Sequence, residues 1–108
     1  MESFGTLIRR IRTAKGLLLR EVAASLRIDP SYLSRIESNT KRATREHVIH
    51  LAAFLKADEN ELLIAYLSDK IIYELQGEKL AMKAMFVAEQ KIQYLTLLSP
   101  TSTDTTKK

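Results

Sequence analysis

The sequence has no cysteine, and no apolar run in it approaches the ~18 residues that a membrane-spanning helix needs. A chain without cysteine forms neither disulfides nor thiolate metal sites, and it is compatible with a reducing cytoplasm. The first ten residues, MESFGTLIRR, lack the apolar core of a signal peptide. We therefore expect a soluble, cytoplasmic protein without a membrane partner.

Glycine and proline are scarce, with three and two residues among 108, and aromatic residues make up only 6% of the chain. This composition is typical of a helix-rich soluble protein, and the length fits one domain or one small domain with an appendage. Alternating strand patterns and internal repeats are absent from the sequence. A domain this small buries a modest fraction of its surface, so dimerisation would add to its stability.

Motifs for catalysis and cofactor binding are missing as well. The sequence has no Gly-rich phosphate loop and no nucleophile elbow, and no motif places its Ser, His and Asp residues as a triad. His47 and His50 are three residues apart, but no third ligand stands at a matching offset for zinc. We predict a protein that is not an enzyme, with no catalytic residue, no metal site and no cofactor.

Positive charge is concentrated in the first half of the chain. Residues 1–57 carry eleven Lys/Arg and five Asp/Glu, a net charge of +6, whereas residues 58–108 carry six and eight, a net charge of −2. A basic first half favours contact with a polyanion such as nucleic acid. Ordinary solubility charge explains the same numbers, so charge alone leaves both interpretations open.

Apolar residues at helical spacing predict a series of helices, and polar residues mark where they begin. Ser3 is suited to cap the first helix and Gly16 to end it. Further helices are predicted over residues 19–26 and 30–38, after Thr44, after Asp58 and over residues 79–98. The helix after Thr44 has a predicted buried stripe of Val48, Ile49, Ala52 and Leu55. Residues 68–69 either interrupt the fifth helix or are absorbed into a longer one that reaches Leu75.

Residues 19–39 predict two short helices joined by a tight turn. Asp29 can cap the second helix, and Pro30 suits its first position because the missing N–H would be unpaired there anyway. The outward positions of this helix are Pro30, Ser31, Tyr32, Ser34, Arg35 and Ser38. Arg35 is the strongest base-reading candidate because a guanidinium pairs with both O6 and N7 of guanine. Alone, this face also fits the solvent side of any amphipathic helix.

The pattern around this segment resembles the helix-turn-helix of the phage-repressor-like (XRE) family. The resemblance rests on Arg12-x3-Gly16-Leu17, Glu21-Val22-Ala23, Ile28-Asp29-Pro30-Ser31 and Leu33-Ser34-Arg35-Ile36-Glu37. It covers about residues 5–66 and implies an all-α, five-helix lambda-repressor-like DNA-binding domain, extended here by a long C-terminal helix. We predict a DNA-binding domain over residues 1–67, a helical dimerisation extension over 68–98 and a disordered tail over 99–108.

The resemblance also implies roles for individual residues. The base-reading set is Pro30, Ser31, Tyr32, Ser34 and Arg35, and the phosphate-contacting set is Arg20, Ser38, Lys41, Arg42 and Arg45. Arg12 and Glu37 stand where family members carry an ion pair that ties the first helix to the end of the third. Such a pair is architectural, because breaking one partner costs more than the pair contributes.

Three positions depart from the family pattern. Leu18 and Leu19 stand where members usually have a Ser or Thr cap followed by a Gln that touches a phosphate. The resemblance therefore predicts no phosphate contact from position 19, and the second helix lacks a side-chain cap. Arg20, at the next position, is placed to supply a phosphate contact instead. Asn39 replaces the usual Gly, a mild change because Asn tolerates positive φ.

The long last helix carries an apolar stripe at heptad spacing. Its members are Ala81, Met85, Ala88, Ile92 and Leu95. The stripe either packs on the preceding helix or forms a dimer interface. We favour the dimer, because one recognition helix reads few base pairs and members of the family usually bind as symmetric dimers.

Taken together, these features predict a sequence-specific transcriptional regulator that binds a symmetric operator in double-stranded DNA as a homodimer. A repressor or a restriction–modification controller is the expected type. The alternative is an antitoxin-like interaction module, in which a second protein is the main partner and DNA binding is secondary.

Overall fold

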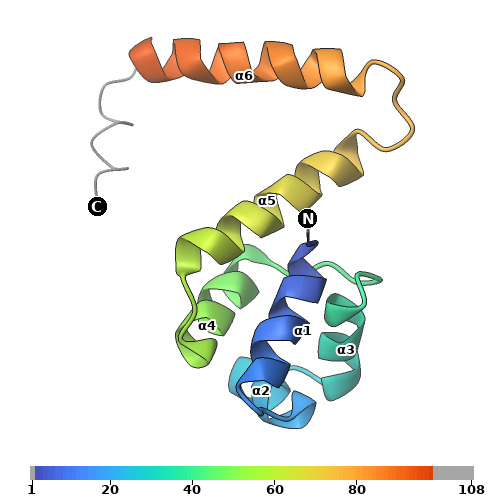
Figure 1. The fold of residues 1–108 in the computed structure, drawn as a ribbon, viewed down its shortest axis with the longest axis vertical. Helices are drawn as coiled ribbons and strands as arrows, with labels where there is room; N and C mark the ends of the chain where they lie inside the picture. The colour runs from blue at the N-terminus through green and yellow to red at the C-terminus, as the bar shows by residue number, and fades with distance from the viewer. Residues whose placement is uncertain (1, 99–108) are drawn as a thin grey trace. The chain divides into compact units, whose positions relative to one another are not determined.

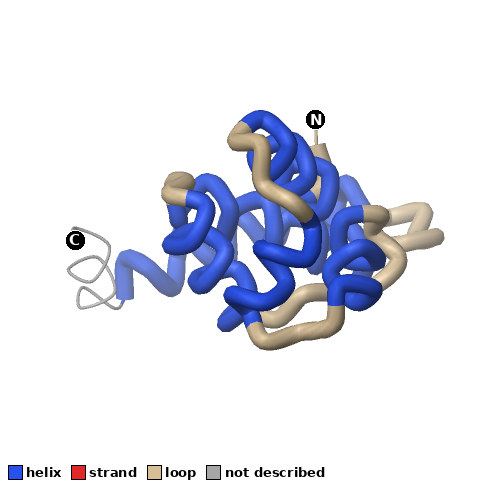
Figure 2. Tube along the Cα trace, turned by 90° about the horizontal axis from the view of Figure 1, so that it is seen from below, coloured by secondary structure: helices blue, strands red, loops and turns tan. Residues whose placement is uncertain are grey.

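The computed structural model describes residues 2–98, which form six α-helices and no strand (Figures 1 and 2). The helices are α1 (Phe4–Ala14), α2 (Leu19–Leu26), α3 (Pro30–Glu37), α4 (Arg45–Leu55), α5 (Glu59–Glu74) and α6 (Ala81–Leu98). The predicted fold class, a five-helix domain plus a long C-terminal helix, is confirmed. The predicted disordered tail, 99–108, lies outside the described residues. Among the described helices, none is long and apolar enough to cross a membrane.

The chain divides into two compact units, the first ending at Glu74 and the second beginning at Leu75. The boundary predicted between residues 67 and 68 falls inside α5, which continues through Ser68 and Asp69. Both polar side chains are satisfied there: the Ser68 hydroxyl donates to the carbonyl of Ala65 (2.9 Å), and Asp69 accepts from the backbone N–H of Phe4 (2.8 Å). Neither residue therefore interrupts the helix.

Side-chain caps begin four of the helices at the predicted residues, and at the start of α5 the carboxylate of Asp58 accepts the N–H of Asn60 at 3.0 Å. The hydroxyl of Ser3 accepts the N–H of Thr6 at the start of α1, and the carboxylate of Asp29 accepts the N–H of Ser31 at the start of α3. Thr44 and His47 cap each other at the start of α4, with N···O and N···N distances of 3.1 and 3.2 Å. Each cap pairs N–H groups that a helix leaves free in its first turn.

The start of α2 lacks such a cap, as the departure at Leu18 predicts. Leu18 occupies the N-cap position without a side-chain acceptor. Glu21 supplies half of a capping box instead, because its carboxylate accepts the N–H of Leu18 at 2.7 Å.

One core joins α1 to α5, and every one of these helices contributes to it (Figure 1). Ile8, Val22, Leu33, Leu55 and Leu62 are fully buried. The predicted stripe of α4 is wrong at one position, since Ile49 is exposed and Leu51 is buried instead. The reason is angular: residues 48, 51, 52 and 55 share one face of a helix with 3.6 residues per turn, whereas residue 49 lies roughly 100° away.

The N-terminal turn of α1 packs against the C-terminal end of α3. A Cβ added at Gly5 would overlap the carbonyl oxygen of Ile36 and lie 2.6 Å from Oδ1 of Asn39. Asn39 ends α3 with φ of +67°, the left-handed conformation predicted for it, and its amide donates to the hydroxyl of Thr6 at 3.4 Å. Only glycine at position 5 allows the two backbones to approach this closely.

Arg12 and Glu37 join the other end of α1 to α3. Nε and Nη2 of Arg12 donate to the two carboxylate oxygens of Glu37 at 2.7 and 3.0 Å, and Nη1 donates to the carbonyl of Leu17 at 2.9 Å. The two side chains are only 13% and 5% exposed. The hydrogen bond to Glu37 raises the pKa of the Arg12 guanidinium, which favours its charged form.

We expect Glu37→Gln to lower the free energy of unfolding by about 3 kcal/mol, because it leaves the shielded Arg12 guanidinium without its counter-charge. Urea unfolding followed by circular dichroism measures the change. Glu2→Gln is the matched control, since Glu2 makes the same two-pronged contact with Arg10 but in water, with side chains 36% and 58% exposed. The control is expected to change stability little. Equal effects of the two substitutions would contradict the structural role of Glu37.

Gly5→Ala is expected to destabilise the domain by about 2 kcal/mol, because the added methyl group must push α1 away from the end of α3. Thermal unfolding measures the loss. Ala is otherwise the better helix former, so a gain in stability at this position would show that the two helices do not approach as described.

Candidate DNA interface

The α2–turn–α3 segment has the geometry of a helix-turn-helix, in which α2 packs against α3 and supports it. Val22 and Ala23 of α2 and Leu33 and Ile36 of α3 are buried together in the core. Arg27 makes the turn between the helices in the left-handed conformation, with φ of +58°. The opposite face of α3 is left toward solvent.

The first turn of α3 carries the cap and the first predicted base-reading residues. Pro30 and Ser31 are exposed. Ser31 donates both its backbone N–H and its hydroxyl to Oδ1 of Asp29, each at 3.0 Å. The backbone bond, followed by the hydroxyl bond, lowers the pKa of Asp29 and favours its ionised form. Because its proton is engaged, the Ser31 hydroxyl offers an incoming ligand its lone pairs.

Ser34 and Arg35 lie further along the same exposed face. Within residues 2–98, no acidic side chain forms an ion pair with Arg35. The Arg35 carbonyl accepts the N–H groups of Thr40 and Lys41 at 2.9 and 3.2 Å, so the chain turns back over the end of α3. The Ser38 hydroxyl donates to the same carbonyl at 3.1 Å. The guanidinium of Arg35 therefore remains available for a bidentate contact.

Tyr32, also predicted to read bases, is half-buried and already has protein partners. Its hydroxyl donates to the carbonyl of Arg42 at 3.3 Å, and its ring meets that of His47 edge-on with centroids 5.7 Å apart. The ammonium of Lys41 lies 5.9 Å from the Tyr32 ring centroid. Tyr32 thus fastens the loop after α3 to α4, a role that the sequence pattern did not indicate.

The predicted phosphate-contacting residues are all exposed and come from three places in the chain. Arg20 lies in the first turn of α2, and Arg45 begins α4. Ser38, Lys41 and Arg42 belong to the loop that connects α3 to α4. Helix starts and exposed cations are both suited to phosphate oxygens. Lys41 and Arg42 lie beside the C-terminal end of α3, because the loop turns back there and the N–H of Lys41 donates to the carbonyl of Arg35.

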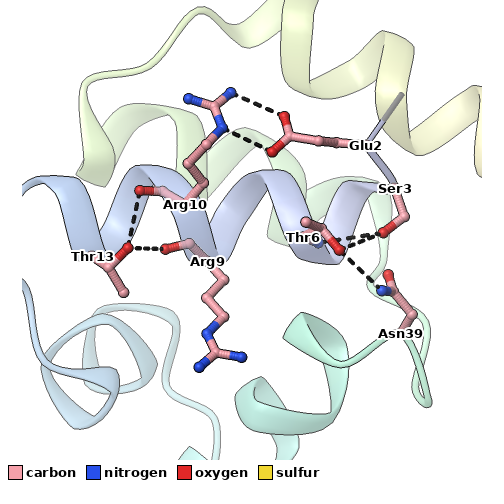
Figure 3. A network of polar contacts seen from close by, with 7 residues as sticks. All are labelled: Glu2, Ser3, Thr6, Arg9, Arg10, Thr13 and Asn39. Atoms are coloured by element: carbon pink, nitrogen blue, oxygen red, sulfur yellow. Dashed lines mark hydrogen bonds and ion pairs between the residues drawn. The ribbon is translucent and has the colours of Figure 1, made fainter.

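The cations of α1 differ in how they are engaged. Arg10 points toward Glu2 and pairs with it, whereas Arg9 leaves the helix on the other side (Figure 3). Within the described part of the chain, neither Arg9 nor Arg35 forms an ion pair. Arg9 is a candidate cation that the sequence reasoning did not single out, because nothing in the local pattern distinguishes it from Arg10.

Two residues of α5 contact α1 and the loop after α3, and the sequence reasoning did not single them out. Asp69 caps the first N–H of α1, and the ring of Tyr73 lies 4.6 Å from the guanidinium carbon of Arg42. Both lie beyond the segment of helix-turn-helix resemblance. Their roles depend on contacts over long sequence separations, and helical periodicity gives no signal for those.

The pattern of the helix-turn-helix family matches residues 8–62. Two solved structures of ClgR, the clp gene regulator of Corynebacterium glutamicum, are similar to the chain. One is 32% identical with a TM-score of 0.53, covering 61% of this chain and 86% of ClgR. The other is 26% identical with a TM-score of 0.54, covering 90% of both chains. A comparison with curated proteins found no match.

The family match spans α2, the turn, α3 and α4, together with most of α1. It begins inside α1 and ends early in α5, so it includes Arg12, Glu37 and every predicted base-reading and phosphate-contacting residue. The second ClgR structure extends the similarity beyond that segment. The chain belongs to the phage-repressor-like (XRE) helix-turn-helix family of DNA-binding regulators.

Proposed function

We propose that the protein is a sequence-specific transcriptional regulator that places α3 in the major groove of an operator. The observation that carries this proposal is the exposed face of α3, where Arg35 has no ion-pair partner within residues 2–98 and an exposed cationic loop follows. A guanidinium that is not held in an ion pair is suited to guanine, and the loop cations are suited to phosphates. Selection from a random duplex library tests the proposal, with enrichment of a defined sequence as the expected result.

The proposal assigns different tasks to neighbouring groups. Ser31, Ser34 and Arg35 read base edges, and Pro30 makes van der Waals contact with a base. Tyr32 contacts a base or a phosphate from its position beside the loop. Arg20, Ser38, Lys41, Arg42 and Arg45 grip the backbone of the duplex. Phosphate contacts position the protein, and base contacts give it specificity.

We expect Arg35→Ala to lower the affinity for the selected operator by roughly 1–3 kcal/mol while binding to random DNA is retained. Arg42→Ala is expected to weaken both kinds of binding alike and to reduce the salt slope by about one, because one fewer phosphate is neutralised. Fluorescence anisotropy over a series of salt concentrations measures both quantities.

Arg10→Ala serves as the control for the loss of one positive charge, because Arg10 is exposed and already paired with Glu2. It is expected to leave operator affinity close to that of the wild type. If Arg35→Ala and Arg42→Ala weakened specific and random binding equally, the division between reading and gripping residues would be wrong.

We further propose that the protein binds a two-fold symmetric operator as a homodimer through α6. Of the 18 residues of α6, only Lys83, Glu89 and Lys91 are charged. The stripe of Ala81, Met85, Ala88, Ile92 and Leu95 follows heptad spacing, and Ile92 and Leu95 are 63% and 60% exposed. A helix this apolar is stable in water only when another surface covers it. A second copy of the chain would bury the apolar stripe and would bring a second α3 to the DNA.

We expect the double substitution Ile92→Glu/Leu95→Glu to convert the dimer into a monomer that still folds but binds the operator weakly. Light scattering coupled to gel filtration gives the oligomeric state, and anisotropy gives the affinity. Leu97→Glu is the control, since Leu97 is 80% exposed but lies off the stripe, roughly 120° from Met85. A dimer that persists in the double variant would place the interface elsewhere.

Binding of such a dimer over a promoter would block transcription, and we propose a repressor or restriction–modification controller on that basis. The apolar surface of α6 also favours one alternative, an antitoxin-like module whose main partner is a second protein. Purification from the native host distinguishes them: a stoichiometric second chain supports the alternative, whereas a homodimer that binds its operator unaided supports the regulator.

A further inference from the structure

The second half of α5 is fixed against the helix-turn-helix domain, although it lies beyond the family match, which ends at residue 62. Asp69 accepts the N–H of Phe4 at 2.8 Å, and the rings of Tyr66 and Phe4 meet edge-on with centroids 5.9 Å apart. These contacts set the direction of the last turns of α5. Tyr73 follows Asp69 by four residues, so it lies on the same side of the helix.

The ring of Tyr73 packs against Arg42, a residue of the loop after α3. The guanidinium carbon of Arg42 lies 4.6 Å from the ring centroid, well inside the range of a cation–π contact. The backbone of the same residue is held from the other side, because its carbonyl accepts the hydroxyl of Tyr32 at 3.3 Å. Arg42 is thus held by α3 through its backbone and by α5 through its side chain.

An aromatic ring holds a guanidinium without neutralising it. A carboxylate partner would occupy the N–H groups and cancel the charge, as Glu37 does for Arg12. A ring contacts the face of the guanidinium and leaves its in-plane N–H donors free for a phosphate. The contact also restricts a long, flexible side chain before any ligand arrives, which lowers the cost of ordering it on binding.

We propose that Tyr73 is a positioning residue for DNA binding, which holds Arg42 in the orientation that contacts a backbone phosphate. The inference rests on the proposed function, and it adds a residue outside the helix-turn-helix to the DNA-binding machinery. Tyr73 is 58% exposed, so its ring contributes little to the core and is free to act through Arg42.

The test compares Tyr73→Leu with Tyr73→Phe in the full chain, each also combined with Arg42→Ala. Tyr73→Leu is expected to weaken binding to operator and random duplex alike by about two- to fivefold, because the ring face is lost. Tyr73→Phe keeps the face and is expected to bind as the wild type does. In the Arg42→Ala background, Tyr73→Leu is expected to have no further effect, a coupling that a merely structural role would not produce.

A second readout needs no DNA. Ring-current shifts of the Arg42 side-chain protons are expected in the free protein, to persist in Tyr73→Phe and to vanish in Tyr73→Leu. Thermal unfolding of each variant confirms that the fold is intact.

The outcomes separate this inference from the proposed function. If the wild type bound no duplex with preference, both would fall. If Arg42→Ala weakened binding as expected but Tyr73→Leu did not, only the inference about Tyr73 would be overturned. It would also be overturned if Tyr73→Leu lost the same affinity in the Arg42→Ala background, or if the wild type lacked the ring-current shifts.

Discussion

The orientation of α3, the helix that we propose enters the major groove, depends on one guanidinium. Arg12 binds the carboxylate of Glu37 at the end of α3 and the carbonyl of Leu17 just before α2, so a single side chain of α1 joins both helices of the motif. Because the pair is buried, it adds little net stability when intact. The loss of either member is nevertheless costly, because it leaves a desolvated charge without a partner. The pair therefore acts mainly to fix geometry. Gly5 and Asn39 complete the constraint at the other end of α1, where two backbones meet with no room for a methyl group. With the inner face of α3 held in this way, its outer face is left for a ligand.

Local chemistry made much of this domain predictable. Asp29 and Pro30 mark the start of α3, Thr44 marks the start of α4, and the absence of a cap at Leu18 follows directly from its side chain. These features depend on neighbours a few residues away, which a sequence displays. Gly5 was not singled out, because the close approach that requires it involves residues more than thirty positions later. A contact distant in sequence also explains Ser68 and Asp69, two polar residues that local composition would allow to interrupt a helix. They lie inside the continuous α5, where Asp69 accepts the N–H of Phe4.

The candidate site shows the same division. Chemical type indicated which side chains suit bases or phosphates, and the fold leaves Ser34, Arg35 and Arg45 exposed as that reasoning requires. Chemical type could not indicate which of these side chains are already engaged in contacts within the protein. Tyr32 carries an aromatic ring and a hydroxyl at an outward position, yet its contacts with Arg42 and His47 bind it to the loop and to α4. Tyr73 gave no signal at all, since an exposed Tyr near the end of a helix is unremarkable until its partner is known.

Four cations of this domain differ in the kind of partner they have. Arg10 and Arg12 face carboxylates, and both guanidinium groups have raised pKa values from hydrogen bonds to those partners. Lys41 and Arg42 face the rings of Tyr32 and Tyr73 instead. A carboxylate orders a cation and cancels its charge, whereas a ring orders it and leaves the charge to act on a ligand. Aromatic partners therefore suit a surface whose cations must be ordered and must still attract a polyanion. The acids and aromatic rings around these four side chains therefore separate the two cations whose charge is already paired from the two that we propose contact DNA.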